Sequence, residues 1–236
     1  MRYFIGNKMI GSEHYKLATV QECLEYFKDI EEPELDTETT GLCCHVDNLL
    51  CIQIGTPDRQ YVIDTGVIDV QVFKPLLEDP SVKKIGQNIK FDFIVLYKQG
   101  IKMNSMEDTM LMSYVLDAGK NRHNMDTLSE IHLQHKTISF KEIVGTGKKE
   151  INFSDVELDK AMEYAAEDAD ITYRLYKIFN KNLKLEKLTN IYEIFEKPLI
   201  EILAFMKIEG IKVDNKFLKV LSEKFVKKIN KIEKEV

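Results

Sequence analysis

The sequence predicts an α/β fold, a mixed central sheet with helices on both faces, followed by a helical appendage at the C-terminus. Short apolar segments of strand length come first and then alternate with longer segments of helical periodicity, a pattern typical of α/β domains. Of the 236 residues, 44 % are hydrophobic, which is ample for a core. No run of about 18 apolar residues occurs, so the sequence predicts no membrane-spanning helix.

Five segments have the length and apolar content of strands. They are Arg2–Ile5, Glu34–Glu38, Leu49–Gly55, Gln60–Asp64 and Val82–Gly86. Six segments have the spacing of helices: Val20–Asp29, Val70–Leu77, Asn88–Gln99, Thr109–Leu116, Met125–Leu133 and Leu158–Asn180. The clearest loop is Gly145–Glu150, where two glycines stand among polar residues.

Asp36 and Glu38 stand two apart on the second predicted strand, so they point to the same face while Thr37 points to the other. Two adjacent carboxylates repel, and at neutral pH they need protons or a cation. Hard divalent metals such as Mg²⁺ are bound by oxygen ligands of this kind. The alternative is an ordinary strand end with two solvated acids, because Asp-x-Glu is a common sequence.

A third carboxylate, Asp92, follows the last predicted strand. Asn88 is a plausible N-cap for the helix that begins there, and Asp92 would lie in the first turn of this helix. Taken alone, Asp92 is simply an acid in the helix position that the helix dipole favours.

A fourth carboxylate, Asp168, shares a helix face with Tyr164, because the two residues are four apart. Ser154 and Glu157 have the spacing of a capping box that would start this helix. Small residues would let the helix approach its neighbours closely: Ala161, Ala165, Ala166 and Ala169. Glu167 and Asp170 lie off this direction, and we expect them to be solvated. The alternative is an amphipathic surface helix with one acid near its buried edge.

These segments, in this order, resemble the three motifs of the DEDD exonuclease superfamily, in the subgroup with a tyrosine in the third motif. The motifs are Asp36-Thr37-Glu38, Asn88 to Asp92 and Tyr164-x-x-x-Asp168. Further segments are similar to the 3′–5′ proofreading exonuclease domain of bacterial DNA polymerase I, of family A: Gly86–Asp92, Arg122–Leu128, His135–Phe140 and Tyr164–Asp170. The likeness covers the chain to residue 188 and implies the RNase H-like exonuclease fold.

The resemblance implies two-metal hydrolysis of a phosphodiester. Asp36, Glu38 and Asp168 would hold the ion that activates the attacking water, and Asp36 with Asp92, directly or through waters, would hold the second. Tyr164 would orient the water, since an ordinary pKa of about 10 makes it a poor base. The expected cofactors are two divalent ions, Mg²⁺ or Mn²⁺, with Zn²⁺ as an alternative.

The same resemblance implies contacts with a single-stranded DNA 3′ end. Leu42 would wedge against the terminal bases, and Phe140 would stack on the 3′ nucleotide. Gln87, Asn88 and Arg122 would contact the strand. Without the family, Leu42 and Phe140 are equally well core residues, and Arg122 is equally well a solvated loop charge.

Composition and charge set further limits. The net charge of −6 argues at first against a nucleic-acid partner, but bound metals neutralise site carboxylates and attract phosphate. His123, His132 and His135 have a poor spacing for a metal cluster, and we expect surface or supporting roles. The four cysteines, Cys23, Cys43, Cys44 and Cys51, show no C-x-x-C spacing. Together with the absence of a signal-peptide pattern, this predicts free thiols in a reducing cytoplasm rather than zinc ligands or disulfides.

The sequence divides into an exonuclease domain, 1–189, and a helical segment, 190–236, that resembles the truncated start of a polymerase domain. Gly210 is a candidate helix C-cap and Asp214 the next N-cap. The last helix has an apolar stripe that needs a partner: Leu218, Leu221, Phe225, Ile229, Ile232 and Val236. A homodimer through this helix, a fold-back or poor order would each account for the stripe. We expect nuclease activity not to depend on the segment, and we expect no polymerase activity from this sequence.

Three functions remain open. The first is a DNA-directed 3′–5′ proofreading exonuclease that acts with a polymerase domain or subunit in replication and repair. The second is an RNase D-like exoribonuclease that uses the same acids. The third is a non-catalytic module that binds DNA or a polymerase. The intact acids argue against the third, and the sequence around the motifs favours DNA.

Overall fold

The structure is a computed structural model, and it describes residues 1–147 and 151–235. The predicted loop Gly145–Glu150 falls partly outside these residues. Within them, Gly145 ends a short helix with a φ of 83°.

A seven-stranded mixed sheet forms the centre of the described chain, with the strand order β2-β1-β5-β4-β3-β6-β7. The strands are β1 Arg2–Ile5, β2 Lys16–Leu17, β3 Glu34–Thr39, β4 Leu49–Gly55, β5 Gln60–Asp64, β6 Lys84–Gly86 and β7 Met106–Asp108. β4 runs antiparallel to β3 and β5, and the other pairs are parallel. All five predicted strands are present, but β2 and β7 were missed and β6 begins two residues later than predicted.

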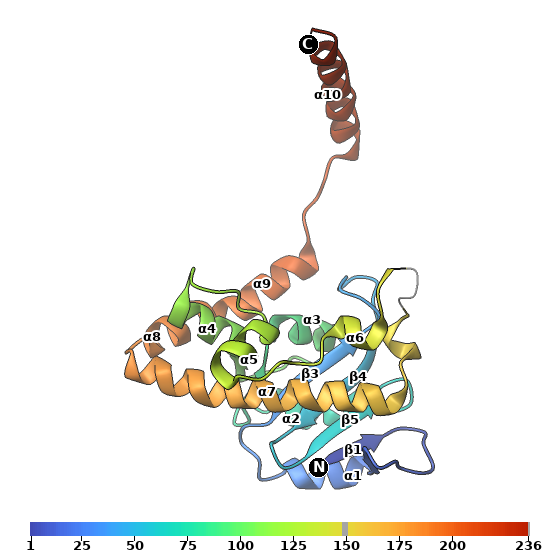
Figure 1. Cartoon of the computed structure of the whole chain (residues 1–236), viewed down its shortest axis with the longest axis vertical. Helices are drawn as coiled ribbons and strands as arrows, with labels where there is room; N and C mark the ends of the chain where they lie inside the picture. Colours follow the sequence, from blue (N-terminus) through green and yellow to red (C-terminus); the bar gives the residue numbers. More distant parts are fainter. Residues whose placement is uncertain (148–150, 236) are drawn as a thin grey trace.

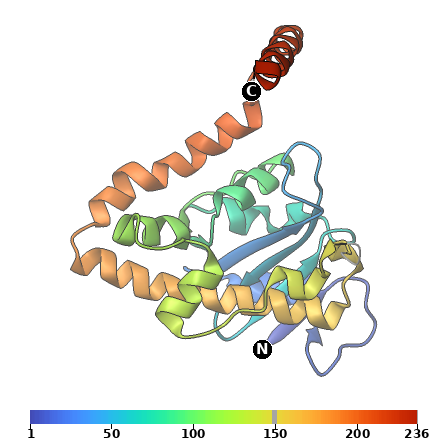
Figure 2. The same ribbon diagram turned by 45° about the horizontal axis from the view of Figure 1, so that its top comes forward.

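Helices cover both faces of this sheet (Figures 1 and 2). The helical segments of the first half are α1 Val20–Phe27, η1 Val70–Phe73, α2 Lys74–Glu78, α3 Lys90–Lys98 and α4 Thr109–Asp117. Those of the second half are α5 Met125–Leu133, α6 Phe140–Val144, η3 Phe153–Asp155, α7 Leu158–Leu185, α8 Thr189–Ile191, the π-helical turn η4 Tyr192–Glu196, α9 Lys197–Glu209 and α10 Asn215–Glu235. The predicted fold class is confirmed.

The alternation of β3 separates the two faces. Leu35 belongs to an apolar core with side chains of α1, α2 and α3, such as Phe27, Leu77 and Phe93. The opposite face carries the acids of β3, and α7 packs against it, contacting β1, β3, β4, β5 and β6. The acidic face of β3 therefore lies under the longest helix of the nuclease fold.

Two predicted helix caps are wrong. Asn88 has a φ of 58°, and the N-cap of α3 is Ile89, without a side-chain hydrogen bond. Ser154 lies in the η3 turn, and α7 begins after Glu157 without a side-chain cap. In both places a short turn precedes the helix, so the polar residue lies in the turn and not at the cap. The α7 helix also runs to Leu185, beyond the predicted end at Asn180.

The helices that follow residue 189 pack on the nuclease fold. Tyr192, Ile200 and Ala204 are buried, and the last two belong to the same apolar core as α3. The Phe205 ring contacts the rings of Phe93 and Tyr97, with centroids 5.8 and 5.1 Å apart. The domain boundary at residue 189 stays a prediction, but α9 shares its core with the helices before it.

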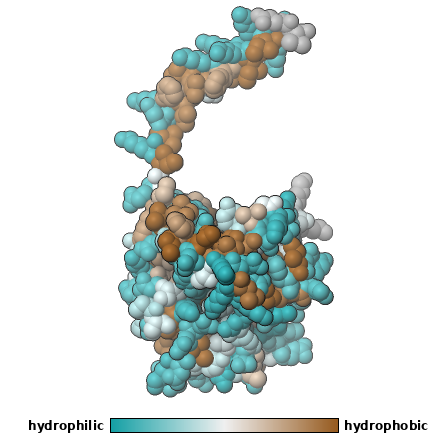
Figure 3. All heavy atoms as spheres, turned by 90° about the vertical axis from the view of Figure 1, so that its left-hand side faces the viewer, coloured by the Kyte–Doolittle hydropathy of each residue, from teal (hydrophilic) through white to brown (hydrophobic). Residues whose placement is uncertain are grey.

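The α10 helix projects away from the rest of the chain (Figure 1). Gly210 ends α9 with a φ of 71°, and the Asp214 carboxylate accepts hydrogen bonds from the first amides of α10, as the sequence predicts. Most of the apolar side chains of α10, among them Phe217, Phe225 and Ile229, are exposed, and Figure 3 shows hydrophobic residues along the projecting helix. Val236, the last residue of the predicted stripe, lies outside the described residues. No helix in the described residues is long and apolar enough to span a membrane.

The packing of α9 yields a first prediction. Removing residues 210–236 should leave the thermal midpoint within about 2 °C of the full chain, because these residues bury little. Removing residues 190–236 should lower it by about 10 °C or more, since the loss uncovers the core around Phe93. Circular dichroism melts of the two truncated chains make the comparison. Equal midpoints would show that residue 189 is an independent domain boundary, as the sequence suggested.

Candidate active site

Asp36, Glu38 and Asp168 form one group of acids. A carboxylate oxygen of each lies within 4.8 Å of the other two. The first two share a face of β3, and α7 brings the third to that face. The buried alanines Ala165 and Ala169 flank Asp168 and let α7 approach the strand closely. The structure thus brings together three of the acids that the sequence singles out.

Asp92 approaches from the other side of β3. It lies in the first turn of α3, as predicted, and its Oδ1 accepts a hydrogen bond of 2.6 Å from the Thr37 hydroxyl. Thr37 points away from Asp36 and Glu38, so one strand positions acids on both of its faces. Asp92 is not among the three acids whose oxygens meet within 4.8 Å.

Burial raises the pKa values of all four acids, and repulsion by neighbouring carboxylates raises those of Glu38, Asp92 and Asp168 further. Burial raises the pKa of Asp36 to about 6. Burial, followed by the charge of Asp36, raises the pKa of Asp92 and that of Asp168 well above their ordinary values. Burial, followed by the charges of Asp36 and of further carboxylates, does the same for Glu38. Among the described residues, none of the four forms an ion pair with a lysine, arginine or histidine. A divalent cation would supply the missing positive charge.

The donor set fits a hard divalent metal. Three carboxylates converge with oxygen atoms only, and no histidine or cysteine joins them. Mg²⁺ and Mn²⁺ are typically bound by such ligands, whereas zinc sites usually include nitrogen or sulfur. The geometry therefore favours Mg²⁺ or Mn²⁺ over Zn²⁺.

Tyr164 lies beside Asp168 on α7, one turn away. Burial, followed by the charges of Asp168 and Glu38, raises the pKa of its phenol far above the ordinary range. The hydroxyl therefore keeps its proton and can act as a hydrogen-bond donor, but not as a base. The water-orienting role of Tyr164 stays a prediction.

Two phenylalanines surround Tyr164. The Phe140 and Phe153 rings are nearly parallel, with centroids 6.1 Å apart, and each meets the Tyr164 ring at a centroid distance of 6.2 Å. Phe140 is 44 % exposed, so it is not the core residue of the alternative reading. Phe153 was not predicted as a site residue. The three rings form an aromatic wall beside the acids.

A cavity of about 470 Å³ joins these groups. Its walls include Asp36, Glu38, Leu42, Gln87, Phe91, Met125, Phe140, Phe153, Tyr164 and Asp168. Leu42 is 82 % exposed at its rim, which excludes the core alternative for this residue. The cavity is large enough for one nucleotide-sized group next to the acids.

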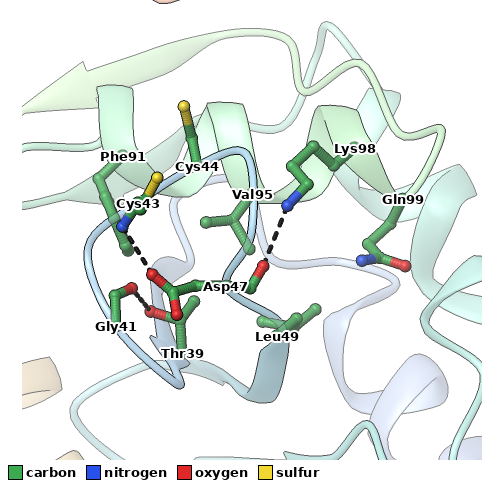
Figure 4. A pocket seen from close by; sticks show the side chains of 10 residues that line it. All are labelled: Thr39, Gly41, Cys43, Cys44, Asp47, Leu49, Phe91, Val95, Lys98 and Gln99. Atoms are coloured by element: carbon green, nitrogen blue, oxygen red, sulfur yellow. Dashed lines mark hydrogen bonds between the residues drawn. The ribbon is translucent and has the colours of Figure 1, made fainter. Parts of the chain in front are cut away.

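The loop that carries Leu42 is tied at both ends (Figure 4). The Asp47 carboxylate accepts a 2.7 Å hydrogen bond from the Cys43 amide, and the Asp47 carbonyl accepts one of 3.0 Å from Lys98 Nζ of α3. The Thr39 hydroxyl donates to the Gly41 carbonyl at 2.7 Å. These bonds hold Leu42 at the cavity rim. All four cysteines, including Cys43 and Cys44 of this loop, are free thiols, as predicted.

Gln87 and Asn88 lie in the turn between β6 and α3, and Asp108 holds this turn. Its carboxylate accepts from the amides of Asn88 and Ile89, at 3.0 and 3.1 Å, and also caps α4. The Gln87 side chain donates to the His123 carbonyl at 2.8 Å and contacts Thr109. Gln87 reaches the cavity, whereas Asn88 is not among the residues that line it.

Arg122 and the three histidines are not among the residues that line the cavity. Arg122 is exposed on the connection between α4 and α5. His123 contacts the Ser113 hydroxyl at 2.9 Å, and His132 packs on the Phe179 ring. His135 pairs with Glu167 at 2.7 Å. The three histidines have separate partners, so they do not form a metal cluster.

Glu167 is not solvated, which corrects the expectation from sequence. Besides its contact with His135, its carboxylate accepts a 2.6 Å hydrogen bond from the Ile138 amide. Asp170, by contrast, is half-exposed, and its carboxylate pairs with Arg174 on the same helix. Glu167 therefore ties the segment that leads to Phe140 onto α7, one residue before Asp168.

Comparison with known proteins identifies the family. The 3′–5′ exonuclease family model of the DNA polymerase A type matches residues 15–184. The chain belongs to this exonuclease family. It is therefore a 3′–5′ exonuclease by family, and the resemblance seen in the sequence is confirmed.

Relatives of this exonuclease include bacterial DNA polymerases I. That of Rhizobium leguminosarum is 45 % identical over 163 residues, which cover 69 % of this chain and 16 % of the relative. Those of Pseudomonas aeruginosa and Borreliella burgdorferi are 33 % and 31 % identical, covering 89 % and 96 % of this chain and 25 % and 26 % of the relatives. The chain thus spans about a quarter or less of each.

Solved structures share the fold. NrnC of Brucella melitensis bound to pGG has a TM-score of 0.69 at 21 % identity, covering 91 % of this chain and 96 % of that one. NrnC has also been solved with bound Mg²⁺. The catalytic core of RRP6 from Trypanosoma brucei has a TM-score of 0.66 at 16 % identity, covering 85 % of this chain and 52 % of that one. At these identities the likeness establishes the RNase H-like fold alone.

The electrostatics of this exonuclease yield a second prediction. The pKa of Asp36 rises from 3.8 to about 6 on folding, so the folded chain holds this proton more tightly than the unfolded chain does. Without metal, the free energy of unfolding should therefore fall as the pH rises from about 4 to above 6. Differential scanning fluorimetry in a chelator should give a lower thermal midpoint at about pH 7.5 than at about pH 5.5.

Mn²⁺ at the higher pH should restore the midpoint, because it replaces the lost protons as counter-charge. Asp36→Asn is the matched control, since it removes one titrating group and should flatten the pH dependence. A midpoint that rises between the two pH values in chelator would contradict the repulsion described above.

Proposed function

We propose that this exonuclease removes nucleoside 5′-monophosphates from the 3′ end of single-stranded DNA with the help of two divalent ions, Mg²⁺ or Mn²⁺. The convergence of Asp36, Glu38 and Asp168 within 4.8 Å, beside the protonated Tyr164, is the observation that carries the proposal. When bound, the two ions would supply an activated water and stabilise the leaving 3′ oxygen.

Each acid has a distinct place in this proposal. Asp36, Glu38 and Asp168 would hold one ion, because their oxygens already converge. Asp36 and Asp92 would hold the second. Asp92 lies across β3 and is held by Thr37, so we propose that it reaches the ion through a water. The Tyr164 hydroxyl would donate a hydrogen bond to orient the attacking water.

The cavity wall would hold the terminal nucleotide. Phe140 and Phe153 offer ring faces on which a base can stack, a sequence-tolerant contact worth about 1–3 kcal/mol per base. Leu42, exposed at the rim, would separate the last bases. Gln87 and Asn88 would contact the strand from the turn that Asp108 holds. Arg122 lies away from the cavity, and we propose for it a contact with the strand outside the site.

The DNA polymerases among the relatives support DNA as the substrate and proofreading as the role, with a polymerase domain or subunit as partner. Pairing of α10 with a second copy of the chain is the other proposed contact. The four free thiols fit a cytoplasmic location. The fold match to NrnC bound to pGG keeps the exoribonuclease as second candidate, since that match spans nearly the whole of NrnC.

A nuclease assay with 3′ single-stranded DNA and RNA of one sequence tests the proposal. We expect 5′-monophosphates from DNA in Mg²⁺ or Mn²⁺, none in chelator, and a slower reaction on RNA. Frayed or mismatched ends should be cut faster than paired ends, because unstacking a terminal nucleotide costs a few kcal/mol. Faster cleavage of RNA would favour the exoribonuclease, and full activity in chelator would exclude the metal mechanism.

Two substitutions test the roles of the residues. Asp36→Ala should abolish cleavage while leaving the metal-free thermal midpoint unchanged or higher, because it removes repulsion among buried acids. Tyr164→Phe should be milder, slowing cleavage by ~10–100-fold, since one orienting hydrogen bond is lost and no metal ligand. Rates at saturating DNA and melts in chelator are the measurements. A midpoint several degrees lower for Asp36→Ala would mean that Asp36 is a structural acid.

A further inference from the structure

Gln53 carries a buried side-chain amide on β4, the strand that pairs with β3. Gln53 is 1 % exposed, and neither its side-chain nitrogen nor its oxygen has a hydrogen-bond partner among the described residues. Leaving such a group unpaired costs about 1–3 kcal/mol. An apolar side chain at this core position would avoid the cost. The amide therefore indicates that Gln53 gains a hydrogen-bond partner in another state of the protein.

The register of the sheet identifies the partner. Gln53 stands directly opposite Asp36 in the antiparallel β3–β4 pair, so the two side chains share a face. Glu38 faces Cys51 in the same pair and is the diagonal neighbour of Gln53, within reach of a long side chain. The Gln53 side chain therefore lies beside those of Asp36 and Glu38 on one face of the sheet, and Gln53 is not among the residues that line the cavity.

Glu38 is the acid whose long side chain can meet the long side chain of Gln53 across this diagonal. The two side chains do not form a hydrogen bond in this structure, because the amide nitrogen of Gln53 has no partner within ordinary limits among the described residues.

We propose that Gln53 is a positioning residue, whose Nε2 donates a hydrogen bond to the Glu38 carboxylate when the acids hold a divalent metal. The inference rests on the metal site of the proposed function. Metal binding requires an ionised Glu38, and a hydrogen bond to an ionised carboxylate is about twice as strong as a neutral one. The bond fixes the rotamer of Glu38 and aims its free oxygen at the metal, as partners behind metal ligands generally do.

Gln60 on β5 provides a matched comparison. It is also buried, and its oxygen is likewise without a partner, but its Nε2 donates to the Thr56 carbonyl at 2.8 Å. It pairs with Gly55, which faces Glu34 at the end of β3 away from Glu38. Gln60 thus has a structural partner and lies farther from the metal ligands, whereas the Gln53 amide has no partner among the described residues and stands beside Asp36 and Glu38.

The experiment compares Gln53→Met with Gln60→Met in the full chain. Methionine keeps the length of the side chain and removes the amide. For Gln53→Met, titration calorimetry should show Mn²⁺ binding ~10–100-fold weaker than in the wild type. Its thermal midpoint in chelator should be unchanged or higher, because an unpaired buried amide is gone. Gln60→Met should bind Mn²⁺ within about twofold of the wild type, with a lower midpoint from the lost bond to Thr56.

Wild-type Mn²⁺ affinity in Gln53→Met would overturn the proposal. A second variant, Gln53→Asn, keeps an amide too short to reach Glu38, and it should lose affinity to the same degree. If Gln53→Met melts several degrees lower and Gln53→Asn binds Mn²⁺ normally, Gln53 is a packing residue only. A wild-type chain that binds no Mn²⁺ would instead reject the metal site of the proposed function, so the two failures are distinct.

Discussion

The burial of four carboxylates without a counter-cation among the described residues is the constraint on which this structure depends. Burial alone raises the pKa of each acid, and their mutual charges raise most of them further. A fold optimised only for stability would place apolar or paired side chains at these positions. The uncompensated charge shows that the site is built for a bound cation. The packed layers on both sides of the sheet offset the free-energy cost of burying the four acids.

The two-residue period of β3 places its side chains alternately on the two faces of the sheet. Asp36 and Glu38 face α7, where flanking alanines leave room for Asp168 and Tyr164. Thr37 faces the other layer and donates its hydroxyl to Asp92 of α3. One strand therefore sets the positions of two helices relative to each other, and a shift of one residue in its register would exchange the two faces. The acids converge because the strand is central and paired on both sides.

Sequence patterns predicted the parts of this site that are local. The β3 alternation, the position of Asp92 in a first turn and the i, i+4 pair of Tyr164 and Asp168 each follow from periodicity within one element. Contacts between distant segments could not be read in this way: Asn88 was taken for a cap because its true partner, Asp108, lies on another strand. Strands β2 and β7 have two and three residues, too few for a period. The short α6, which the sequence analysis does not predict, carries a local signal in its Ser139–Glu142 capping box.

Residues that follow the three motifs in the chain also support the site. Every proposed ligand precedes residue 189, yet the Tyr192 hydroxyl accepts the Asp108 amide at 2.9 Å and donates to Glu107 at 3.0 Å. Lys197 pairs with the same Glu107 at 2.5 Å. The Asp108 carboxylate accepts hydrogen bonds from the turn at Asn88, which precedes α3 and Asp92. Movement of α9 relative to α3 must break these bonds or carry the turn with it. The segment after residue 189 is thus bonded to the turn that precedes α3 and Asp92, and the two cannot be treated as mechanically separate.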